Sequence, residues 1–428
     1  MGGMLETLRN AWKIPDLRKK ILFTIAMLLV FRVGSHIPVP FLDAKEFAKL
    51  IESGGSLLGM FDIVTGGALK LATIFAMSIT PYINASIIMQ LLTVAIPRLE
   101  QLAKEGEEGR KIIGQYIRYG TVLLGFLQAV GLYFGMRGSL TQTGIISFIT
   151  VTLTFTAGTA FLMWLGEQIT EKGIGNGISL LIFAGIVSRG PQGAVALGNL
   201  YTGGSVGTGI FGVLGIALIL VMFIAVVAAV IWVNQAERRV PVQYAKRVVG
   251  RKMYGGQSTH IPIKVNLAGV IPIIFAMSIM AFPSTIASFV APASTNWFIL
   301  LLKNATSQWW YAIVYALLIM FFTFFYTIIQ FNPIEIANNM KKNGGFIPGI
   351  RPGKPTSDYI SKVLNRVTWF GGLFLALITV FPYIFEAFGV KGLWFSGTAL
   401  LILVGVALDT VKQIESQMLM RHYKGFLE

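Results

Sequence analysis

The residue types that usually carry enzymatic chemistry are scarce in the long apolar segments of this chain. It contains no Cys, so it has no thiolate nucleophile, no disulfide and no thiolate metal site. Its His residues, His36, His260 and His422, lie outside the apolar segments or at their margins. Ion-coupled transporters usually keep Asp, Glu, Lys or His within the membrane, where these residues are costly and functional. We therefore expect no catalytic residue, no metal site and no cofactor.

Two glycine-rich patterns match catalytic or cofactor motifs by letter only. Gly203–Gly207 has the spacing of a nucleophile elbow, and Gly207–Gly212 has that of a dinucleotide-binding loop. Neither follows a predicted strand, and both lie in a loop before an apolar segment, so we discount them. The sequence also lacks the GxxxxGK[ST] phosphate loop, which excludes nucleotide hydrolysis by that route.

The composition of the chain is that of a membrane protein. Of its 428 residues, 54% are hydrophobic and 13% are charged, and the mean hydropathy is +0.70. Soluble domains carry about a quarter charged residues. Segment 178–188 is short, and segment 69–96 carries Pro81 in its interior. Together, ten apolar segments predict ten membrane-spanning helices, at residues 21–39, 69–96, 112–136, 146–166, 178–188, 209–233, 265–290, 309–331, 367–388 and 392–408.

A half-length apolar stretch precedes the second segment. It runs from Leu57 to Thr65, is apolar except for Asp62, and ends at Gly66–Gly67. Nine helical residues reach about 14 Å, whereas the hydrocarbon core of a membrane is about 30 Å thick. The stretch is therefore expected to enter the membrane without crossing it. Such an interruption predicts a cavity, because non-helical backbone at membrane depth needs protein or water around it.

Basic residues are concentrated on one side of the predicted spans. They occur in the amphipathic N-terminal segment 1–20 and in the connections 234–264 and 332–366, and the net charge is +16. Connections on the opposite side hold few basic residues, although Lys45 and Lys49 weaken the pattern. Because cytoplasmic loops are rich in Lys and Arg, both termini are predicted to be cytoplasmic. The C-terminal cytoplasmic tail would be residues 409–428.

One six-residue sequence occurs twice, since Ile74–Ile79 and Ile274–Ile279 both read IFAMSI. Coincidence among common apolar letters is one explanation. The alternative is an inverted repeat of two five-helix halves, residues 21–188 and 209–408, joined by the outer loop 189–208. Five spans separate the two copies, so they run in opposite directions through the membrane. Halves related in this way meet around a central site or pathway.

The two basic connections are each about thirty residues long, far above the usual length of a loop. In the first, Arg239–Tyr244 and residues 252–265 predict a β-hairpin. In the second, residues 341–353 are dense in Gly, Pro and Asn and predict a non-helical stretch. The basic side chains serve either as a topology signal alone or as a docking surface for a partner.

The remaining candidate residues are isoleucines. Side chains four residues apart share a helix face, and such isoleucine pairs occur in segments 69–96 and 178–188. Single candidates lie in segments 265–290 and 392–408. Isoleucines so placed line a pore or, more commonly, face lipid or pack in a core. The six candidates are Ile79, Ile83, Ile178, Ile182, Ile274 and Ile402.

Several long motifs occur in order along essentially the whole chain. They are FxxxxGGAL at 61–69, ITPYINASIIMQLL at 79–92, LEQLAKEGEEGRKI at 99–112, ITEKGIGNGISLLIFAGIV at 169–187, QAERRVPVQYAKR at 235–247, QSTHIPIKVNLAGVIPIIFA at 257–276 and NGGFIPGIRPGKPT at 343–356. In this order they resemble the SecY family, which forms the channel subunit of the bacterial Sec protein-translocation complex.

The resemblance implies an all-α membrane protein with ten transmembrane helices in two inverted halves, a half-helix plug and long cytoplasmic loops. The six isoleucines would form a pore ring, with a register that includes Ile186 left open in the short fifth span. The plug would cover residues 57–67, including Leu58, Phe61, Asp62, Ile63 and Val64. Spans two and seven would form a lateral gate near Ser78, Asn84, Gln90, Ser278 and Phe282.

The function implied by the resemblance is a channel, not an enzyme, in the bacterial cytoplasmic membrane. It would pass unfolded polypeptides and release apolar segments sideways into membrane lipid. The implied partners are SecE, SecG, the ATPase SecA, the ribosome, signal sequences and nascent chains. Docking of cytoplasmic partners would use Arg239, Lys246, Arg247, Arg251 and Arg351. A secondary transporter for small solutes, also built from inverted repeats, is the alternative, and a membrane enzyme ranks third.

Overall fold

The chain folds almost entirely into helices. The computed structural model describes residues 9, 11–53, 62, 65–192, 195, 198, 210–244, 247–249, 252–254, 258–290, 308–387 and 397–424. The first part of the chain contains α2 (Pro15–Gly34), α3 (Ala44–Ser53), α5 (Thr80–Ala95), α6 (Pro97–Lys104), α7 (Glu107–Gly135), α8 (Ile145–Lys172) and α9 (Gly177–Val187). The second part contains α11 (Ile210–Gln235), α12 (Ile271–Val290), α14 (Trp309–Gln330), α15 (Pro333–Lys342), α16 (Lys354–Ala387) and α17 (Gly397–Lys424).

Each of the ten predicted segments overlaps one of these helices. Within the described residues, six helices are long and apolar enough to cross a membrane by length and composition. The number rises to seven if α5 and α6, which meet at an angle of 102°, count as one span. The short fifth segment is confirmed as a helix, because α9 has 11 residues. The count of ten crossings stays a prediction.

The prediction of one continuous helix over residues 69–96 is wrong. Residues 65–79 form consecutive turns, and α5 begins only at Thr80. Pro81 therefore lies in the first turn of α5, where its missing N–H and fixed φ suit a helix start, and not in the interior. Ser78, just before α5, has φ +51°, a left-handed conformation that interrupts a helix.

The turn stretch 65–79 is held by segments distant in sequence. The Val39 N–H donates to the Ala72 carbonyl at 2.9 Å, and the Ile74 N–H donates to the Ile37 carbonyl at 3.0 Å. The ring of Phe75 stacks between Phe31 of α2 and Phe161 of α8, with centroids 6.1 and 6.0 Å away. The stretch is therefore surrounded by protein, as non-helical backbone at membrane depth must be.

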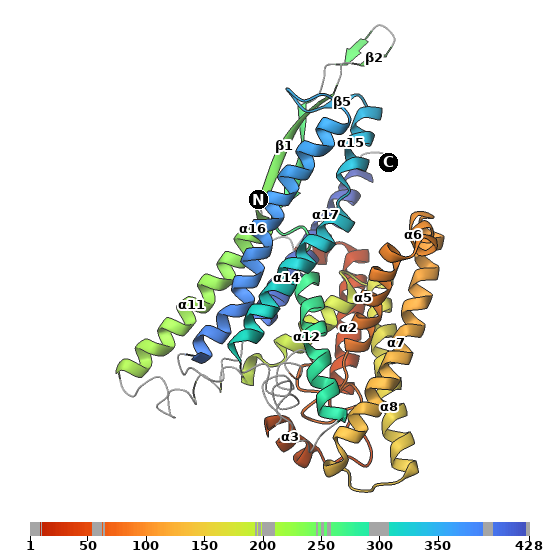
Figure 1. Cartoon of the computed structure of the whole chain (residues 1–428), viewed down its shortest axis with the longest axis vertical. Coiled ribbons are helices and arrows are strands. Elements are labelled where there is room, and N and C mark those ends of the chain that lie inside the picture. The colour runs from red at the N-terminus through yellow and green to blue at the C-terminus, as the bar shows by residue number, and fades with distance from the viewer. Residues whose placement is uncertain are drawn as a thin grey trace.

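A small sheet caps one end of the molecule, which we call the sheet end (Figure 1). Its strand order is β4–β1–β5, where β1 is Glu237–Tyr244, β4 is Ser258–Lys264 and β5 is Gly345–Phe346. Strands β1 and β4 pair antiparallel, with Glu237 opposite Lys264 and Gln243 opposite Ser258. Two further strands, β2 (Arg247–Val249) and β3 (Lys252–Tyr254), pair with each other. The predicted hairpin is thus confirmed for β1 with β4, although residues 252–265 divide between β3 and β4. The predicted absence of helix over residues 341–353 is confirmed from residue 343 onward and is wrong for Lys341 and Lys342, which end α15.

The sheet end has a hydrophobic core of its own. Val240, Val242 and Ile263 from the sheet pack with Met340 of α15 and with residues of α16. Asn332 caps α15 by accepting the N–H groups of Ile334 and Glu335. These contacts fold the two long connections into one body.

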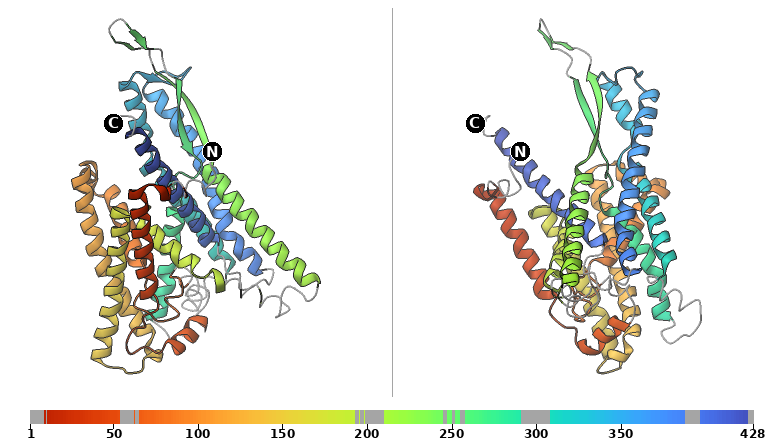
Figure 2. Two further views of the ribbon diagram at one scale, coloured as in Figure 1. Left: turned by 180° about the vertical axis from the view of Figure 1, so that it is seen from behind. Right: turned by 90° about the vertical axis from the view of Figure 1, so that its left-hand side faces the viewer.

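Loops and chain ends are sorted between the two ends of the helical body. Figure 1 and Figure 2 show that α6, α15, the beginning of α2 and the end of α17 lie toward the sheet end, whereas α3 lies at the opposite end. This arrangement agrees with the predicted sidedness of the basic connections. The helices before α11 and those from α11 onward form two groups, which contact each other where α12 packs on α5 and α7 and where α17 packs on α9.

Candidate functional site

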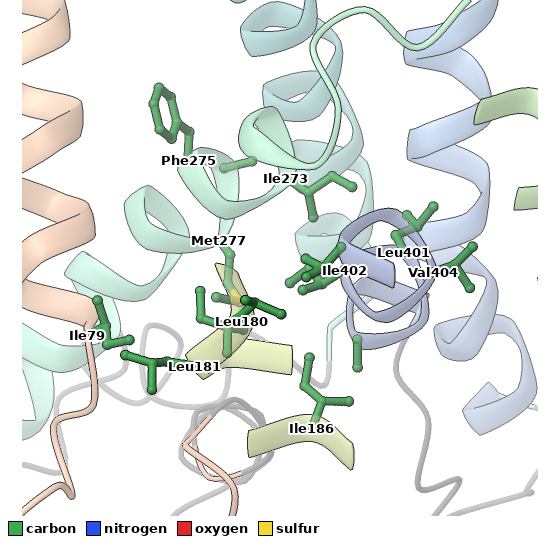
Figure 3. Packing of buried hydrophobic residues seen from close by; sticks show 14 of the residues in the cluster. Ile79, Leu180, Leu181, Ile186, Ile273, Phe275, Met277, Leu401, Ile402 and Val404 are labelled. Atoms are coloured by element: carbon green, nitrogen blue, oxygen red, sulfur yellow. The ribbon is translucent and has the colours of Figure 1, made fainter. Parts of the chain in front are cut away.

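The six candidate isoleucines come together in one hydrophobic cluster where the two helix groups meet. Ile79, Ile182 and Ile402 are almost fully buried within it, and the other three are partly buried against it. The isoleucines come from α5 with the turn before it, α9, α12 and α17, and the cluster also includes residues of α2, α8, α11, α14 and α16. Figure 3 shows labelled side chains from these four elements approaching one another, including Ile79 and Ile402.

The short helix α9 contributes more residues than its two candidate isoleucines. Leu180, Leu181 and Ile186 are also buried in the cluster. The side chain of Ile178 lies against α8, because a Cβ placed on Gly166 would be 2.4 Å from its Cδ1. Of the two registers left open by the sequence, the pair Ile182 and Ile186 is therefore better placed at the centre of the cluster.

Sequence reasoning also missed Met277 of α12 and Leu401 of α17, both buried in the cluster. Their signal was present, since each lies within a few residues of a chosen isoleucine on the same helix. The choice had considered isoleucine alone, whereas a close-packed contact between helices uses whichever apolar side chains fill the space.

The chemistry available to this cluster is apolar. Its described side chains are aliphatic, thioether or aromatic, with the hydroxyl of Tyr315 bonded to Thr398. A hydrated ion meets no ligand in such a constriction and would have to shed its water to pass. Among the described residues, no group of three or more His, Cys, Asp or Glu side chains could hold a metal ion.

The residues predicted to form a plug are only partly described. Leu58, Phe61, Ile63 and Val64 lie outside the described residues, whereas Asp62 is described and buried. The Asp62 carboxylate forms an ion pair with Arg189, which follows the end of α9. Its Oδ1 also accepts the backbone N–H of Lys70 at 2.8 Å. The sequence shows Asp62 as an isolated charge in an apolar stretch but gives no sign that it pairs with Arg189.

The predicted gate residues lie where the two helix groups touch. Ser78 and Asn84 of the α5 region and Ser278 of α12 are buried, and α5 contacts α12 directly. Gln90 is partly buried on α5. Phe282 belongs to α12, and its side chain lies outside the described residues.

The predicted docking residues belong to the sheet end. Arg239 is exposed on β1 and forms an ion pair with Glu237 at 2.7 Å. Arg247 begins β2, whereas Lys246 and Arg251 lie outside the described residues.

Arg351 is exposed on a structured turn. The Thr356 hydroxyl donates to its carbonyl at 2.9 Å, and Gly349 and Gly353 on either side adopt φ +81° and +108°. The backbone that carries this guanidinium is therefore fixed, although the side chain is free to meet a partner.

Comparison with known proteins identifies a family for this chain. The family model SecY matches residues 73–411 of the chain. The protein translocase subunit SecY of Streptomyces galbus is 47% identical over 443 residues, which cover 99% of this chain and 100% of the relative. The proteins of the same name from Thermotoga maritima and Bacillus subtilis are 45% and 44% identical, each over 439 residues, covering 99% of this chain and 98% and 100% of the relatives.

Solved structures agree on the fold. A protein conducting channel superposes with a TM-score of 0.61 at 19% identity, covering 94% of this chain and 92% of that chain. Sec61 in the canine ribosome-channel complex superposes with a TM-score of 0.59 at 18% identity and the same coverage. The family model matches residues 73–411, and the relatives match along almost their whole length. These findings show that the chain belongs to the SecY family.

Proposed function

We propose that this chain is a passive, gated channel through which unfolded polypeptides cross a membrane. The observation that carries the proposal is that the candidate isoleucines, from elements of both helix groups, lie in one apolar cluster. A translocating chain displays every type of side chain, so a polar site that bound one type tightly would stall it. An apolar constriction offers no such site and still opposes ions.

In this proposal the cluster is the pore ring, formed by Ile79, Ile83, Ile182, Ile274 and Ile402, with Ile186 a better member than Ile178. The plug, residues 57–67, covers the resting channel. The contact between α5 and α12 is the lateral gate, through which an apolar signal sequence leaves the pore for lipid. Membership of the SecY family supports this assignment over a transporter for small solutes.

The membrane arrangement follows the same proposal. Ten spans form two halves related by an inverted repeat, and the protein resides in the bacterial cytoplasmic membrane. The sheet end, with both termini, faces the cytoplasm, because basic residues are concentrated in its two long connections and in the N-terminal segment. The bacterial relatives support this location.

Energy must come from a partner, since the sequence has no phosphate loop for nucleotide hydrolysis. We propose the ATPase SecA and the ribosome as partners that dock on the sheet end, and SecE and SecG as partners within the membrane. Two structures with the same fold contain a ribosome, namely the canine ribosome-channel complex and the idle yeast Ssh1 complex bound to the yeast 80S ribosome. Both support docking of a ribosome on this chain.

The proposed pore ring is tested by replacing two of its apolar side chains with polar ones. Replacing Ile83 and Ile274 with Asn should let ions leak through the resting channel and let defective signal sequences pass, because polar side chains remove the dewetting barrier and loosen the closed packing. The measurement is conductance in planar bilayers, together with SecA-driven translocation into vesicles. Ile279→Asn, at an exposed position of α12, is the matched control and should stay closed. Unchanged conductance in the double variant would remove these residues from the ring.

A further inference from the structure

The turn that ends the predicted plug, residues 62–67, is tied to the end of α9 by a buried ion pair. Asp62 and Arg189 contact through their charged groups, and their side chains are 4% and 16% exposed. The pairs Arg118–Glu167 and Lys104–Glu100 are far more exposed. Exposed pairs contribute little, whereas removing one partner of a buried pair is strongly destabilising. Loss of the Asp62–Arg189 pair should therefore destabilise the protein more than loss of either exposed pair.

The two oxygens of the Asp62 carboxylate have separate tasks. Oδ1 accepts the Lys70 N–H and so shapes the turn that runs through Gly66 and Gly67. The other oxygen, Oδ2, contacts a guanidinium nitrogen of Arg189. The Asp62 backbone carbonyl also accepts the Gly67 N–H at 2.9 Å. One side chain thus joins the local conformation of the turn to a distant helix end.

Two further contacts reinforce the attachment at Gly66. Its carbonyl accepts a hydrogen bond from Arg32 of α2 at 3.3 Å and lies 3.5 Å from the Ser188 hydroxyl. A Cβ on Gly66 would lie 2.8 Å from the Cα of Gly185 in α9, and the φ of Gly66 is +67°. Only glycine permits this approach of the two backbones. The approach brings residue 62 within reach of Arg189.

We propose that Asp62 and Arg189 are positioning residues that hold the plug turn against α9 and so set how often the resting channel opens. This inference rests on the function proposed above. Displacing the turn separates two charges that the structure keeps largely away from water. Among the residues that the structure describes, the Nε of Arg189 has no hydrogen-bond partner, so its guanidinium depends on Asp62 for compensation. A polypeptide that enters the channel must supply the free energy needed to separate the two charges. In the absence of such a polypeptide, the ion pair therefore suppresses opening.

The test removes the charge while keeping the turn. Asp62→Asn retains the Oδ1 acceptor for Lys70 but loses the ion pair, and Arg189→Gln removes the opposite charge. Each single variant should raise the resting ion leak in planar bilayers about tenfold, in keeping with the coupling energies of contacting pairs. Each should also relax the requirement for an intact signal sequence. The swap Asp62→Arg with Arg189→Asp should recover part of the seal, and Arg189→Lys should leak less than Arg189→Gln.

The matched control is Glu167→Gln, which breaks the exposed pair with Arg118 and should leave the leak unchanged. Single-variant leaks equal to the wild-type leak, in protein that translocates normally, would overturn the positioning role while leaving the channel proposal standing. An equal leak in the swap and in the single variants would also overturn it. A failure of the wild-type protein to translocate any polypeptide would instead contradict the proposed function.

Discussion

At the scale of single residues, Arg351 separates the two interpretations of the basic connections. A topology signal counts charge near span ends and is insensitive to which basic residue supplies it. A docked partner distinguishes Arg from Lys, because a guanidinium pairs bidentately with a carboxylate or phosphate and an ammonium does not. The fixed turn around Arg351, anchored by Thr356, favours docking.

We therefore expect Arg351→Lys and Arg351→Glu to insert with normal topology and to assemble with SecE, yet to lose SecA-driven translocation, the Glu variant more severely. The measurement is ATP-dependent uptake of a precursor into vesicles, alongside protease mapping of topology. Arg366→Lys, at an exposed position of α16, is the control and should translocate normally. Full translocation by Arg351→Glu would leave the topology signal as a sufficient explanation.

At the scale of elements, the helices could be predicted from apolar segments, whereas their interruption could not. Segment 69–96 is apolar throughout, so periodicity alone favours one helix. The helix begins at Thr80 because Pro81 suits a first turn and because residues 65–79 find hydrogen-bond partners around Ile37 and Val39. Those partners lie more than thirty residues away, and no local pattern indicates them.

The candidate site likewise includes features that the sequence predicts and features that only the packing of the helices reveals. The isoleucine pairs of segments 69–96 and 178–188 were chosen because residues four apart on a helix share a face, whereas their role as a ring was implied only by the family resemblance. The register in α9 required the contact between Ile178 and Gly166, which depends on how α8 and α9 pack. The Asp62–Arg189 pair joins residues that are 127 positions apart and was beyond sequence reasoning altogether.

The contact of α5 with α12 gives a prediction at this scale. Cysteines at Asn84 and Phe282, in a chain that has none of its own, should form a disulfide across the proposed gate and block translocation until reduced. The bond requires Cα atoms within about 7 Å. The control pair is Ala85 and Gly120, where a Cβ would lie 3.4 Å from its neighbour. That disulfide joins α5 to α7 within one helix group and should not block, so efficient translocation by the crosslinked gate would show that these helices need not part.

At the scale of the whole molecule, the sheet end and the helical body have separate hydrophobic cores. The docking surface can then be loosened without opening the pore. Ile263 is fully buried in the core of the sheet end, so Ile263→Ala should cost about 2–5 kcal/mol locally. We expect faster proteolysis of the hairpin and weaker binding of SecA or ribosomes, with unchanged ion conductance.

Cosedimentation with ribosomes and timed protease digestion measure the first two effects, and planar bilayers measure the third. Thr259→Ala, an exposed change on the same strand, should alter none of them. A rise in ion leak in Ile263→Ala would contradict the independence of the two cores.

The turn stretch 65–79 also bears on how this chain is itself made. Its peptide groups cannot enter lipid alone, because unpaired backbone groups there cost several kcal/mol each. Phe75 stacks on Phe161, and the Ile74 carbonyl would be 2.0 Å from a Cβ on Gly158, so the site for this stretch is complete only once α8 exists. During synthesis residues 65–79 must therefore wait in a watery, protein-lined space until some ninety later residues have emerged. Biogenesis of this chain thus requires a conduit of the kind that we propose it becomes.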